Sequence, residues 1–358
     1  MAMWKNLLGL VRRPKPEVAQ TRHDVVHAER RWRLLRFVPT TRRYQTPIVM
    51  VPSLINRWYV LDLAPGRSLV EWLVARGHEV YVVDWGQPEP EDRFTSFDDL
   101  VGKAIGRALR RACKHSGAPK AHLLGYCMGG TLTTVHAAVH PERVASLTTL
   151  AAPVAFEDDD TVLARWTRHS DFDVDAFVGG LGNAPSTLLQ TAFTLAQPLL
   201  MPSKAMFLLG RARHDADWTD DMLDGFFAKE RWANDNVSLP GEVFRAWVQS
   251  FYREDALMRG TLELEGHPVH LEALAMPMHV LTFEHDTIVP KKSALPLVER
   301  ASSEDLTHTH LPGGHVGAVV SSSAHRKLWP VLADWWATRD AAVPSTKRPV
   351  SRSEPAAE

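Results

Sequence analysis

Apolar stretches of two lengths alternate along most of the chain. Short continuous runs rich in Val, Ile and Leu are typical of strands buried on both faces of a sheet, and the longer amphipathic stretches between them predict helices. The predicted strands cover residues 48–51, 80–83, 122–124, 144–150, 279–283 and 306–311. The predicted helices cover residues 68–76, 97–114, 129–139 and 293–300, and a last helix runs to about residue 337 with Pro330 in its first turn. This alternation predicts an α/β architecture, with a mostly parallel sheet covered by helices on both faces.

The alternation stops between residues 156 and 274. This interval has helical patterns broken by turns at Gly179-Gly180 and at residues 182–185, and the sheet pattern resumes near Pro277. We therefore expect a mainly helical cap, inserted after one strand, that shields a selective site. The predicted organisation is an N-terminal extension (1–40), an α/β core (41–155 and 275–340), the cap (156–274) and a disordered tail (341–358).

One short motif carries the strongest chemical signal. The sequence Gly125-Tyr126-Cys127-Met128-Gly129-Gly130 follows a predicted strand and precedes a predicted helix. This is the arrangement of a nucleophile elbow, with cysteine in place of serine, in which flanking glycines let strand and helix approach closely. A helix N-terminus behind the sulfur also favours a thiolate. The sequence thus predicts that Cys127 is a nucleophile, and the alternative is a small buried cysteine in a packing site.

Two later loops supply the partners that a cysteine nucleophile needs. Asp286 lies just past the predicted strand 279–283, and His315 lies between glycines just past the strand 306–311. The order nucleophile, acid, histidine is the one found in α/β-hydrolase folds. We therefore predict an α/β-hydrolase fold with a Cys127–His315–Asp286 triad. A turn-capping aspartate and one structural histidine among 17 are the alternatives.

An oxyanion hole is expected beside the elbow. In this fold it uses the backbone N–H that follows the nucleophile, here that of Met128, and a second N–H from the loop after an early strand. That loop follows the predicted strand 48–51, and Leu54 or Ile55 is the expected donor.

Composition and charge exclude several other functions. The formal net charge of −1 gives no general reason to expect nucleic acid as a partner. The two cysteines, Cys113 and Cys127, are expected to be free thiols in a reducing compartment. No Cys/His cluster, acidic cluster or glycine-rich phosphate loop is present in the sequence, so we expect no metal and no cofactor.

No stretch of the sequence predicts a membrane span. The longest apolar interval, residues 188–209, is interrupted by glutamine, proline and lysine, and the run at residues 7–11 is too short for a signal peptide. These patterns favour a cytoplasmic protein.

The predicted triad indicates acyl transfer. His315 would take the thiol proton of Cys127, and the thiolate would attack an acyl carbonyl to form an acyl-S-enzyme. Exchange between a thiol and a thioester costs little free energy, which favours a thioester substrate. The chemistry alone leaves the acceptor open, because water would make a hydrolase and another hydroxyl group a transferase.

The chain resembles the catalytic subunit of class III polyhydroxyalkanoate synthases, with class IV close by. The resemblance rests on motifs spread over most of the chain: Val51-Pro52-Ser53-Leu54-Ile55-Asn56-Arg57, Val83-Asp84-Trp85-Gly86, the elbow, Leu181-Gly182-Asn183-Ala184-Pro185, Glu230-Arg231-Trp232, Gly241-Glu242-Val243-Phe244-Arg245, Asp286-Thr287-Ile288-Val289-Pro290 and Gly313-Gly314-His315-Val316-Gly317. Three positions depart from the pattern expected in close relatives, namely Tyr126, Met128 and Thr287.

The resemblance implies a polymerase that uses (R)-3-hydroxyacyl-CoA, such as 3-hydroxybutyryl-CoA, and releases CoA. Cys127 would carry the growing chain, His315 would activate Cys127, and Asp286 would help to activate the 3-hydroxyl group that attacks the acyl thioester. The cap would exclude water, which competes with that hydroxyl. The family also implies a second synthase subunit and a cytoplasmic location at the surface of polymer granules, and it leaves a homodimer open.

Two other functions fit part of the pattern. The elbow and triad also suit a cysteine-nucleophile thioesterase or polyester depolymerase, although the cap motifs favour the synthase. A non-catalytic granule protein that kept the fold is the third alternative, and the complete set of triad residues argues against it.

Overall fold

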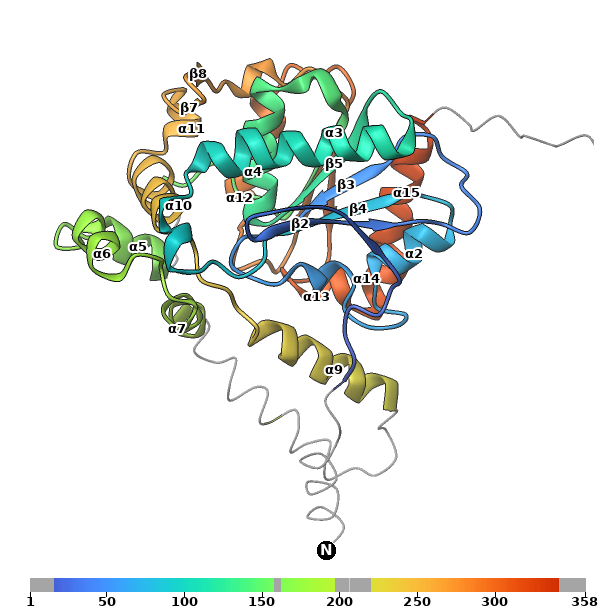
Figure 1. Ribbon diagram of the computed structural model, residues 1–358, viewed down its shortest axis with the longest axis horizontal. Helices are drawn as coiled ribbons and strands as arrows, with labels where there is room; N and C mark the ends of the chain where they lie inside the picture. Colours follow the sequence, from blue (N-terminus) through green and yellow to red (C-terminus); the bar gives the residue numbers. More distant parts are fainter. Residues whose placement is uncertain (1–15, 158–161, 197–205, 207–219, 341–358) are drawn as a thin grey trace, which may run out of the picture.

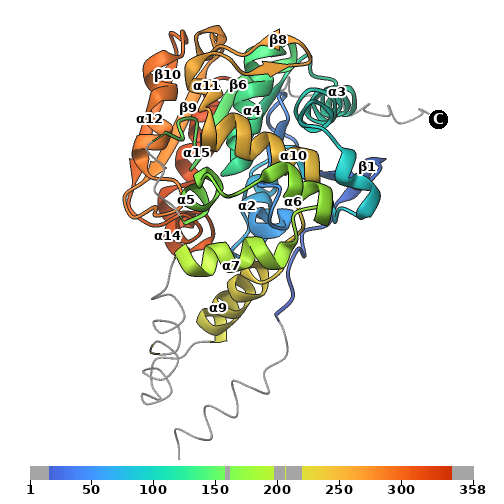
Figure 2. The ribbon, with the colours of Figure 1, turned by 90° about the vertical axis from the view of Figure 1, so that its left-hand side faces the viewer.

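A computed structural model describes residues 16–157, 162–196, 206 and 220–340. The predicted disordered tail (341–358) and the apolar run at residues 7–11 lie outside the described residues. Within the described part, a central sheet carries helices on both faces, and a group of helices lies against one side of it (Figures 1 and 2).

The central sheet has eight strands in the described part of the chain, in the order β1-β2-β4-β3-β5-β6-β9-β10. Their bounds are β1 (Asp24–Glu29), β2 (Trp32–Phe37), β3 (Ile48–Val51), β4 (Val80–Asp84), β5 (Ala121–Tyr126), β6 (Val144–Leu150), β9 (Met278–Phe283) and β10 (Leu306–Leu311). Neighbouring strands from β4 to β10 pair in parallel, whereas β1 and β2 pair antiparallel. The predicted mostly parallel sheet is therefore confirmed. The carboxyl ends of its parallel strands share one edge, where the loops gather.

Two apolar clusters cover the two faces of the sheet. One contains side chains of α3 (Ile105–Ser116), α4 (Met128–Val139) and α12 (Lys291–Arg300), and the other contains side chains of α2 (Leu69–Ala75), α13 (Gly317–Val320), α14 (Ser322–Lys327) and α15 (Trp329–Ala337). Local signals set the helix ends. Ser68 Oγ accepts a hydrogen bond from the N–H of Glu71 at 2.8 Å and so caps α2, and Gly117 ends α3 in the left-handed conformation.

The sheet begins earlier in the chain than the sequence predicted. Residues 1–40 were expected to form an extension, yet β1 and β2 join the sheet through antiparallel pairing of β2 with β4. Two arginines of β2 form ion pairs with carboxylates at the ends of β4, Arg33 with Asp84 at 2.5 Å and Arg36 with Glu79 at 2.8 Å. The basic residues that gave this segment an irregular pattern are thus part of its strand pairing, and the prediction of an extension is wrong for residues 24–37.

The chain between β6 and β9 is mainly helical. It contains α5 (Val162–Arg168), α6 (Val174–Leu181), α7 (Ser186–Ala196), α9 (Asp220–Ala233), α10 (Gly241–Ala246), a π-helical turn (Trp247–Arg253), α11 (Ala256–Arg259), the short strands β7 (Glu263–Leu264) and β8 (His267–Pro268) and a 3-10 turn (Leu271–Ala273). In Figure 2 helices α5, α6, α7, α9 and α10 lie together in front of the sheet. Asp255 ties the start of this insertion to its end, because its carboxylate accepts from the N–H groups of Phe156 and Glu157 at 3.1 and 3.2 Å.

Three buried histidines lie at the amino ends of the parallel strands. His78 precedes β4, His122 lies in β5 and His279 lies in β9, and each is about 1% exposed. Both ring nitrogens of His78, Nε2 of His122 and Nδ1 of His279 have no hydrogen-bond partner among the described residues. Burial lowers the pKa of His78 to about 4, of His122 to about 3 and of His279 to about 4. All three are therefore neutral in the folded protein at neutral pH.

These histidines predict acid-sensitive folding. Their pKa values lie below the ordinary 6.5, so the unfolded chain binds protons more readily, and stability that is complete above pH 6.5 falls as the pH drops toward 4. Each histidine contributes a slope of up to about 1.4 kcal/mol per pH unit. Urea unfolding measured from pH 7 to pH 4.5 should show this loss. His78→Phe should flatten the slope, and the exposed control His285→Phe should not; equal slopes in both variants would contradict the assignment.

Candidate active site

Cys127 occupies a strained turn between β5 and α4. Its backbone has φ 56° and ψ −130°, a region that costs a residue with a side chain on the order of 1–3 kcal/mol. Two hydrogen bonds hold it there: the N–H of Cys127 donates to the Leu150 carbonyl at 2.9 Å, and its own carbonyl accepts from the N–H of Gly130 at 2.8 Å. The side chain is half-buried and touches both apolar clusters. The neighbouring strand β6 thus supports the strained turn.

Glycines around Cys127 let backbones approach more closely than side chains allow. A Cβ at Gly129 would overlap the carbonyl oxygen of Val51, and a Cβ at Gly125 would overlap the Cα of Gly130. The elbow, the start of α4 and the loop after β3 are therefore packed backbone against backbone.

His315 and Asp286 meet above the ends of the last two strands. His315 Nδ1 lies 2.7 Å from Asp286 Oδ2, and their side chains are 8% and 0% exposed. The two loops are fastened to each other, because the N–H of His285 donates to the Gly313 carbonyl at 2.9 Å and that of Glu284 donates to the Leu311 carbonyl at 3.0 Å. The parallel pairing of β9 and β10 thus positions the pair.

The other oxygen of Asp286 is occupied by its own loop. Asp286 Oδ1 accepts from the N–H groups of Ile288 and Val289 at 2.9 and 2.8 Å. Both carboxylate oxygens are therefore engaged, one by the loop and one by the imidazole, which fixes the orientation of His315.

The electrostatic setting of His315 favours its protonated form. Burial alone would lower the pKa of His315, but the negative charges of Cys127 and Asp286 and its hydrogen bonds to both side chains outweigh burial and raise the pKa to about 10. The structure thus brings together the side chains of Cys127, His315 and Asp286, which the sequence identified from widely separated motifs. The arrangement can hold a thiolate–imidazolium pair, the form in which a cysteine is nucleophilic.

Tyr126, which departs from the residue expected beside the nucleophile, is also part of the site. Its ring stacks on that of His315, with centroids 5.3 Å apart and an angle of 28° between the planes. Its hydroxyl donates to the His315 carbonyl at 3.3 Å, and the side chain is fully buried. An aromatic face against a protonated imidazole is attractive. An aromatic residue beside the nucleophile was the available sequence signal, but nothing in the sequence linked it to position 315.

The loop after β3 lies beside the elbow. A Cβ at Gly129 would also come within 2.7 Å of the Pro52 carbonyl oxygen, so this loop touches the first turn of α4, which begins at Met128. Leu54 and Ile55, the two predicted oxyanion residues, are 4% and 7% exposed. The loop that carries Leu54 and Ile55 thus begins in contact with the first turn of α4.

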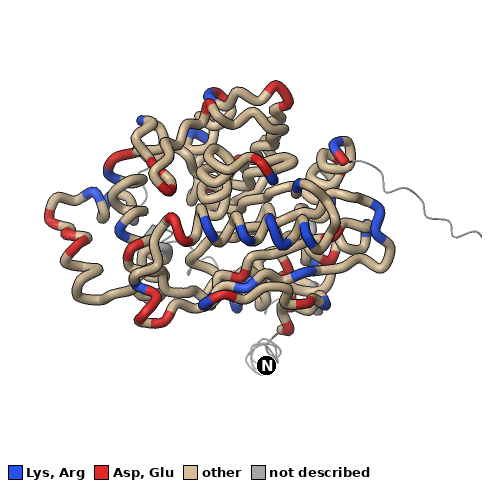
Figure 3. The backbone as a smooth tube through the Cα atoms, turned by 45° about the horizontal axis from the view of Figure 1, so that its top comes forward, with Lys and Arg blue, Asp and Glu red and all other residues tan. Residues whose placement is uncertain are grey.

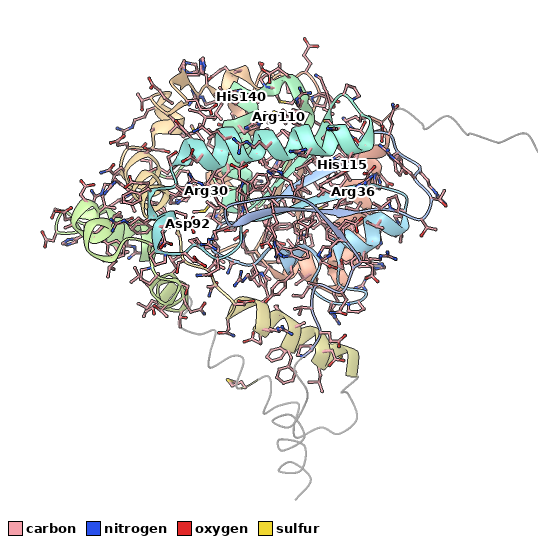
Figure 4. All side chains as sticks on the ribbon, viewed as in Figure 1. Arg30, Arg36, Asp92, Arg110, His115 and His140 are labelled. Carbon is pink, nitrogen blue, oxygen red and sulfur yellow. The ribbon has the colours of Figure 1, made fainter. Side chains whose placement is uncertain are left out.

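A surface hollow borders this loop on another side. It has a volume of about 260 Å³, and Leu54 and Trp85 form part of its apolar lining, with Arg30 and Asp92 also in its wall (Figure 4). Most of its charged side chains are ion-paired: Arg31 with Glu89 and Asp92, Arg107 with Glu29, and Lys103 with Asp99. The hollow is therefore not strongly charged.

Helix α3 presents a basic face to solvent. Basic side chains recur along it and the turn before it (Figure 3), and they are Lys103, Arg107, Arg110, Arg111 and Lys114. Arg110 and His115 on this helix are labelled in Figure 4.

The described residues contain neither a candidate metal cluster nor a membrane-spanning helix. Among the residues that the structure describes, no three His, Cys, Asp or Glu side chains converge in the manner of a metal site. None of the helices in the described ranges is both long and apolar enough to cross a bilayer.

Two family models match the chain. A model described as the alpha/beta hydrolase fold matches residues 46–322, and one described as the N-terminus of poly-beta-hydroxybutyrate polymerase (PhaC) matches residues 15–73. The second model covers the β1–β2 hairpin and the loop after β3. The α/β-hydrolase fold predicted from the sequence is confirmed.

Curated relatives named poly(3-hydroxyalkanoate) polymerase subunit PhaC match over most of the chain. The protein of Synechocystis sp. is 32% identical over 94% of this chain and 89% of its own length, and that of Allochromatium vinosum is 31% identical over 81% and 80%. The protein of Haloferax mediterranei is 35% identical over 90% of this chain, which spans 65% of the length of that relative.

Solved structures share the fold at low sequence identity. A monoacylglycerol lipase of Paleococcus ferrophilus has a TM-score of 0.53 and 17% identity, covering 86% of this chain and 99% of its own. MenH of Staphylococcus aureus has a TM-score of 0.54 and 12% identity, covering 87% and 99%. At such identities the likeness concerns the fold alone.

Removal of the histidine should reduce the reactivity of the cysteine. We expect His315→Gln to slow alkylation of Cys127 by iodoacetamide at neutral pH by at least about tenfold, because the thiol loses its base. The rate is measured by mass spectrometry of the Cys127 peptide. His285→Gln, a substitution at an exposed histidine of the adjoining loop, is the control. An unchanged rate in His315→Gln would refute the pairing.

Replacement of Tyr126 should separate its two contacts. Tyr126→Phe keeps the stacked ring and should alkylate at nearly the parental rate. Tyr126→Ile loses the ring, and we expect about a fivefold slower alkylation, corresponding to about 1 kcal/mol of aromatic interaction with the imidazolium. Equal rates in Tyr126→Ile and the parent protein would show that the stacking does not support the pair.

Proposed function

Because the chain belongs to the family of poly(3-hydroxyalkanoate) polymerase PhaC subunits, we propose that it polymerises (R)-3-hydroxyacyl-CoA with release of CoA. The observation that carries the proposal is the assembled arrangement of Cys127, His315 and Asp286 at the elbow of a chain from this family. The resemblance implies 3-hydroxybutyryl-CoA as the typical substrate.

Acylation is the first half of the proposed cycle. His315 holds the proton of the Cys127 thiol, and the thiolate attacks the acyl carbonyl carbon of the CoA thioester. The tetrahedral intermediate collapses as the bond to the CoA sulfur breaks, and His315 returns the proton to that sulfur. The products are free CoA and a 3-hydroxyacyl group on Cys127.

Chain extension is the second half. The 3-hydroxyl group of another 3-hydroxyacyl-CoA attacks the thioester carbonyl on Cys127, and His315 accepts the hydroxyl proton. The new ester bond forms as the bond to the Cys127 sulfur breaks, which leaves the Cys127 thiolate beside protonated His315 and the lengthened chain on CoA. This chain then acylates Cys127 again, and CoA leaves with the proton from His315. The resemblance implied that Asp286 helps to activate this hydroxyl. Since its side chain is fully buried and both of its oxygens are engaged, we propose that Asp286 acts through His315 and does not touch the substrate.

The oxyanion of each intermediate needs two donors. We propose the N–H groups of Met128, at the start of α4, and of Leu54. The N–H of Ile55 already donates to Ser53 Oγ at 3.5 Å, which favours Leu54 over Ile55.

The location and partners of the protein belong to the same proposal. Leu181, Leu195 and Met222 are exposed on cap helices α6, α7 and α9, with exposed fractions of 57%, 60% and 43%. Apolar side chains on this side support contact with the surface of a polymer granule in the cytoplasm. We propose a second synthase subunit as partner, with a homodimer as a further assembly.

A direct assay tests the polymerase. Incubation with (R)-3-hydroxybutyryl-CoA, with and without a second synthase subunit, should release CoA and yield insoluble polyester. Cys127→Ala should abolish both products, because the covalent carrier is lost. CoA is followed with a thiol reagent and the polymer by chromatography after methanolysis.

The alternative functions give different outcomes. Stoichiometric release of CoA and free 3-hydroxybutyrate, with no polymer even in the presence of the second subunit, would identify a thioesterase and refute the synthase. Full CoA release by Cys127→Ala would refute the assignment of the nucleophile. Cys113→Ala is the matched control, because Cys113 is buried in α3, away from the elbow.

A further inference from the structure

A short extended segment joins the cap to the loop after β3. This segment, residues 235–239, lies between α9 and α10, and we refer to it as the strap. Asn236 of the strap forms an antiparallel bridge with Asn56, and their side-chain amides are hydrogen-bonded. The N–H of Val237 donates to the Ile55 carbonyl at 3.1 Å. The strap therefore holds the backbone one residue away from Leu54, the proposed oxyanion donor.

Asp235 is the charged anchor of the strap. Its Oδ2 accepts from the Tyr59 hydroxyl at 2.7 Å, and its Oδ1 accepts from Arg57 Nε at 3.3 Å. Burial, together with the hydrogen bond to Asp235, raises the pKa of Tyr59, so the hydroxyl remains a donor. Just before the strap, Trp232 Nε1 donates to the Arg57 carbonyl at 2.9 Å. Asp235 thus fixes both ends of the short stretch from Arg57 to Tyr59.

The far end of the strap is fastened to another part of the cap. Leu239 and Ala184 exchange two backbone hydrogen bonds, at 2.9 and 3.0 Å, in the turn between α6 and α7. At Gly241, just past the strap, a Cβ would overlap the Gly182 carbonyl oxygen, so the two segments pack backbone against backbone. The strap therefore connects the α6–α7 turn with the loop after β3.

Residues from three separate sequence motifs meet at the strap. The residues at 51–57, 181–185 and 230–232 come from distant parts of the sequence, and neither the triad nor the elbow requires the last two. In the structure all three sets meet at the strap. A partly buried arrangement of this kind, held by backbone and side-chain hydrogen bonds, can transmit the position of the cap to the loop after β3.

We propose that Asp235 is a positioning residue for the oxyanion hole, which it orients through Arg57, Tyr59 and the strap. The inference rests on the proposed acyl-transfer function, and specifically on Leu54 as donor. It follows that the oxyanion hole is complete only while the cap is docked on this loop. Asp235 itself does not touch the reacting atoms.

The test compares two reactions of Cys127. Acylation by p-nitrophenyl acetate forms a sulfur–carbon bond, expels p-nitrophenolate and passes through an oxyanion. Alkylation by iodoacetamide displaces iodide and forms no oxyanion. We expect Asp235→Ala to slow the acylation burst about 10- to 100-fold, somewhat less than removal of an oxyanion donor, and to leave alkylation unchanged. Asp171→Ala, at an exposed carboxylate of the same cap, is the control and should change neither rate.

An unchanged acylation rate in Asp235→Ala would show that the strap does not position the donor. A parallel loss of acylation and alkylation would indicate general damage to the site. The milder Tyr59→Phe, which removes one hydrogen bond, must then slow acylation alone if the inference is to stand.

The simple ester keeps this test separate from the proposed function. If the parent protein is acylated by the ester but makes no polyester from (R)-3-hydroxybutyryl-CoA, the polymerase function is refuted. The acylation rates of the Asp235 and Tyr59 variants would still test the positioning role of Asp235. Parent protein that is not acylated at all would refute the oxyanion hole and the inference with it.

Discussion

The contact of backbone against backbone at the elbow is the constraint on which the site depends. Strand β5, helix α4 and the loop after β3 approach so closely that Gly125 and Gly129 admit no side chain. The closeness fixes Cys127 in a strained conformation that an isolated turn would relax. The strain is sustained because parallel strands on either side, β3 and β6, are buried and cannot shift independently. The position of the nucleophile is thus a property of the whole sheet.

Around that fixed point, the remaining groups are held by contacts of different kinds. Asp286 and His315 rely on the pairing of β9 with β10 and on the hydrogen bonds between their loops. The loop after β3 is held from the other side, by residues that enter from the cap. The triad side chains therefore lie on the sheet, whereas the loop after β3 is also held by the inserted helical segment.

Local signals accounted for the parts of the fold that the sequence predicted. The strands at residues 48–51 and 144–150 have the predicted bounds because continuous apolar runs require burial on both faces. The order of the three triad residues followed from the carboxyl ends of parallel strands. The hairpin β1–β2 was missed because its arginines are neutralised by Glu79 and Asp84, which lie far along the chain. The stacking of Tyr126 on His315 and the contacts of Asp235 also join segments that are distant in the sequence. The periodicity of apolar residues does not predict such pairs.

The hairpin that completes the sheet also forms one of its edges. Strand β1 lies at the edge of the sheet, where free backbone groups could pair with a strand of a neighbouring molecule. Its pairing register shifts between Val25 and His27, and Asp24 and Glu29 place carboxylates at its two ends. An irregular edge resists the addition of an identical strand. Molecules crowded together at high local concentration can thereby remain separate and folded, without fusing their sheets into an aggregate.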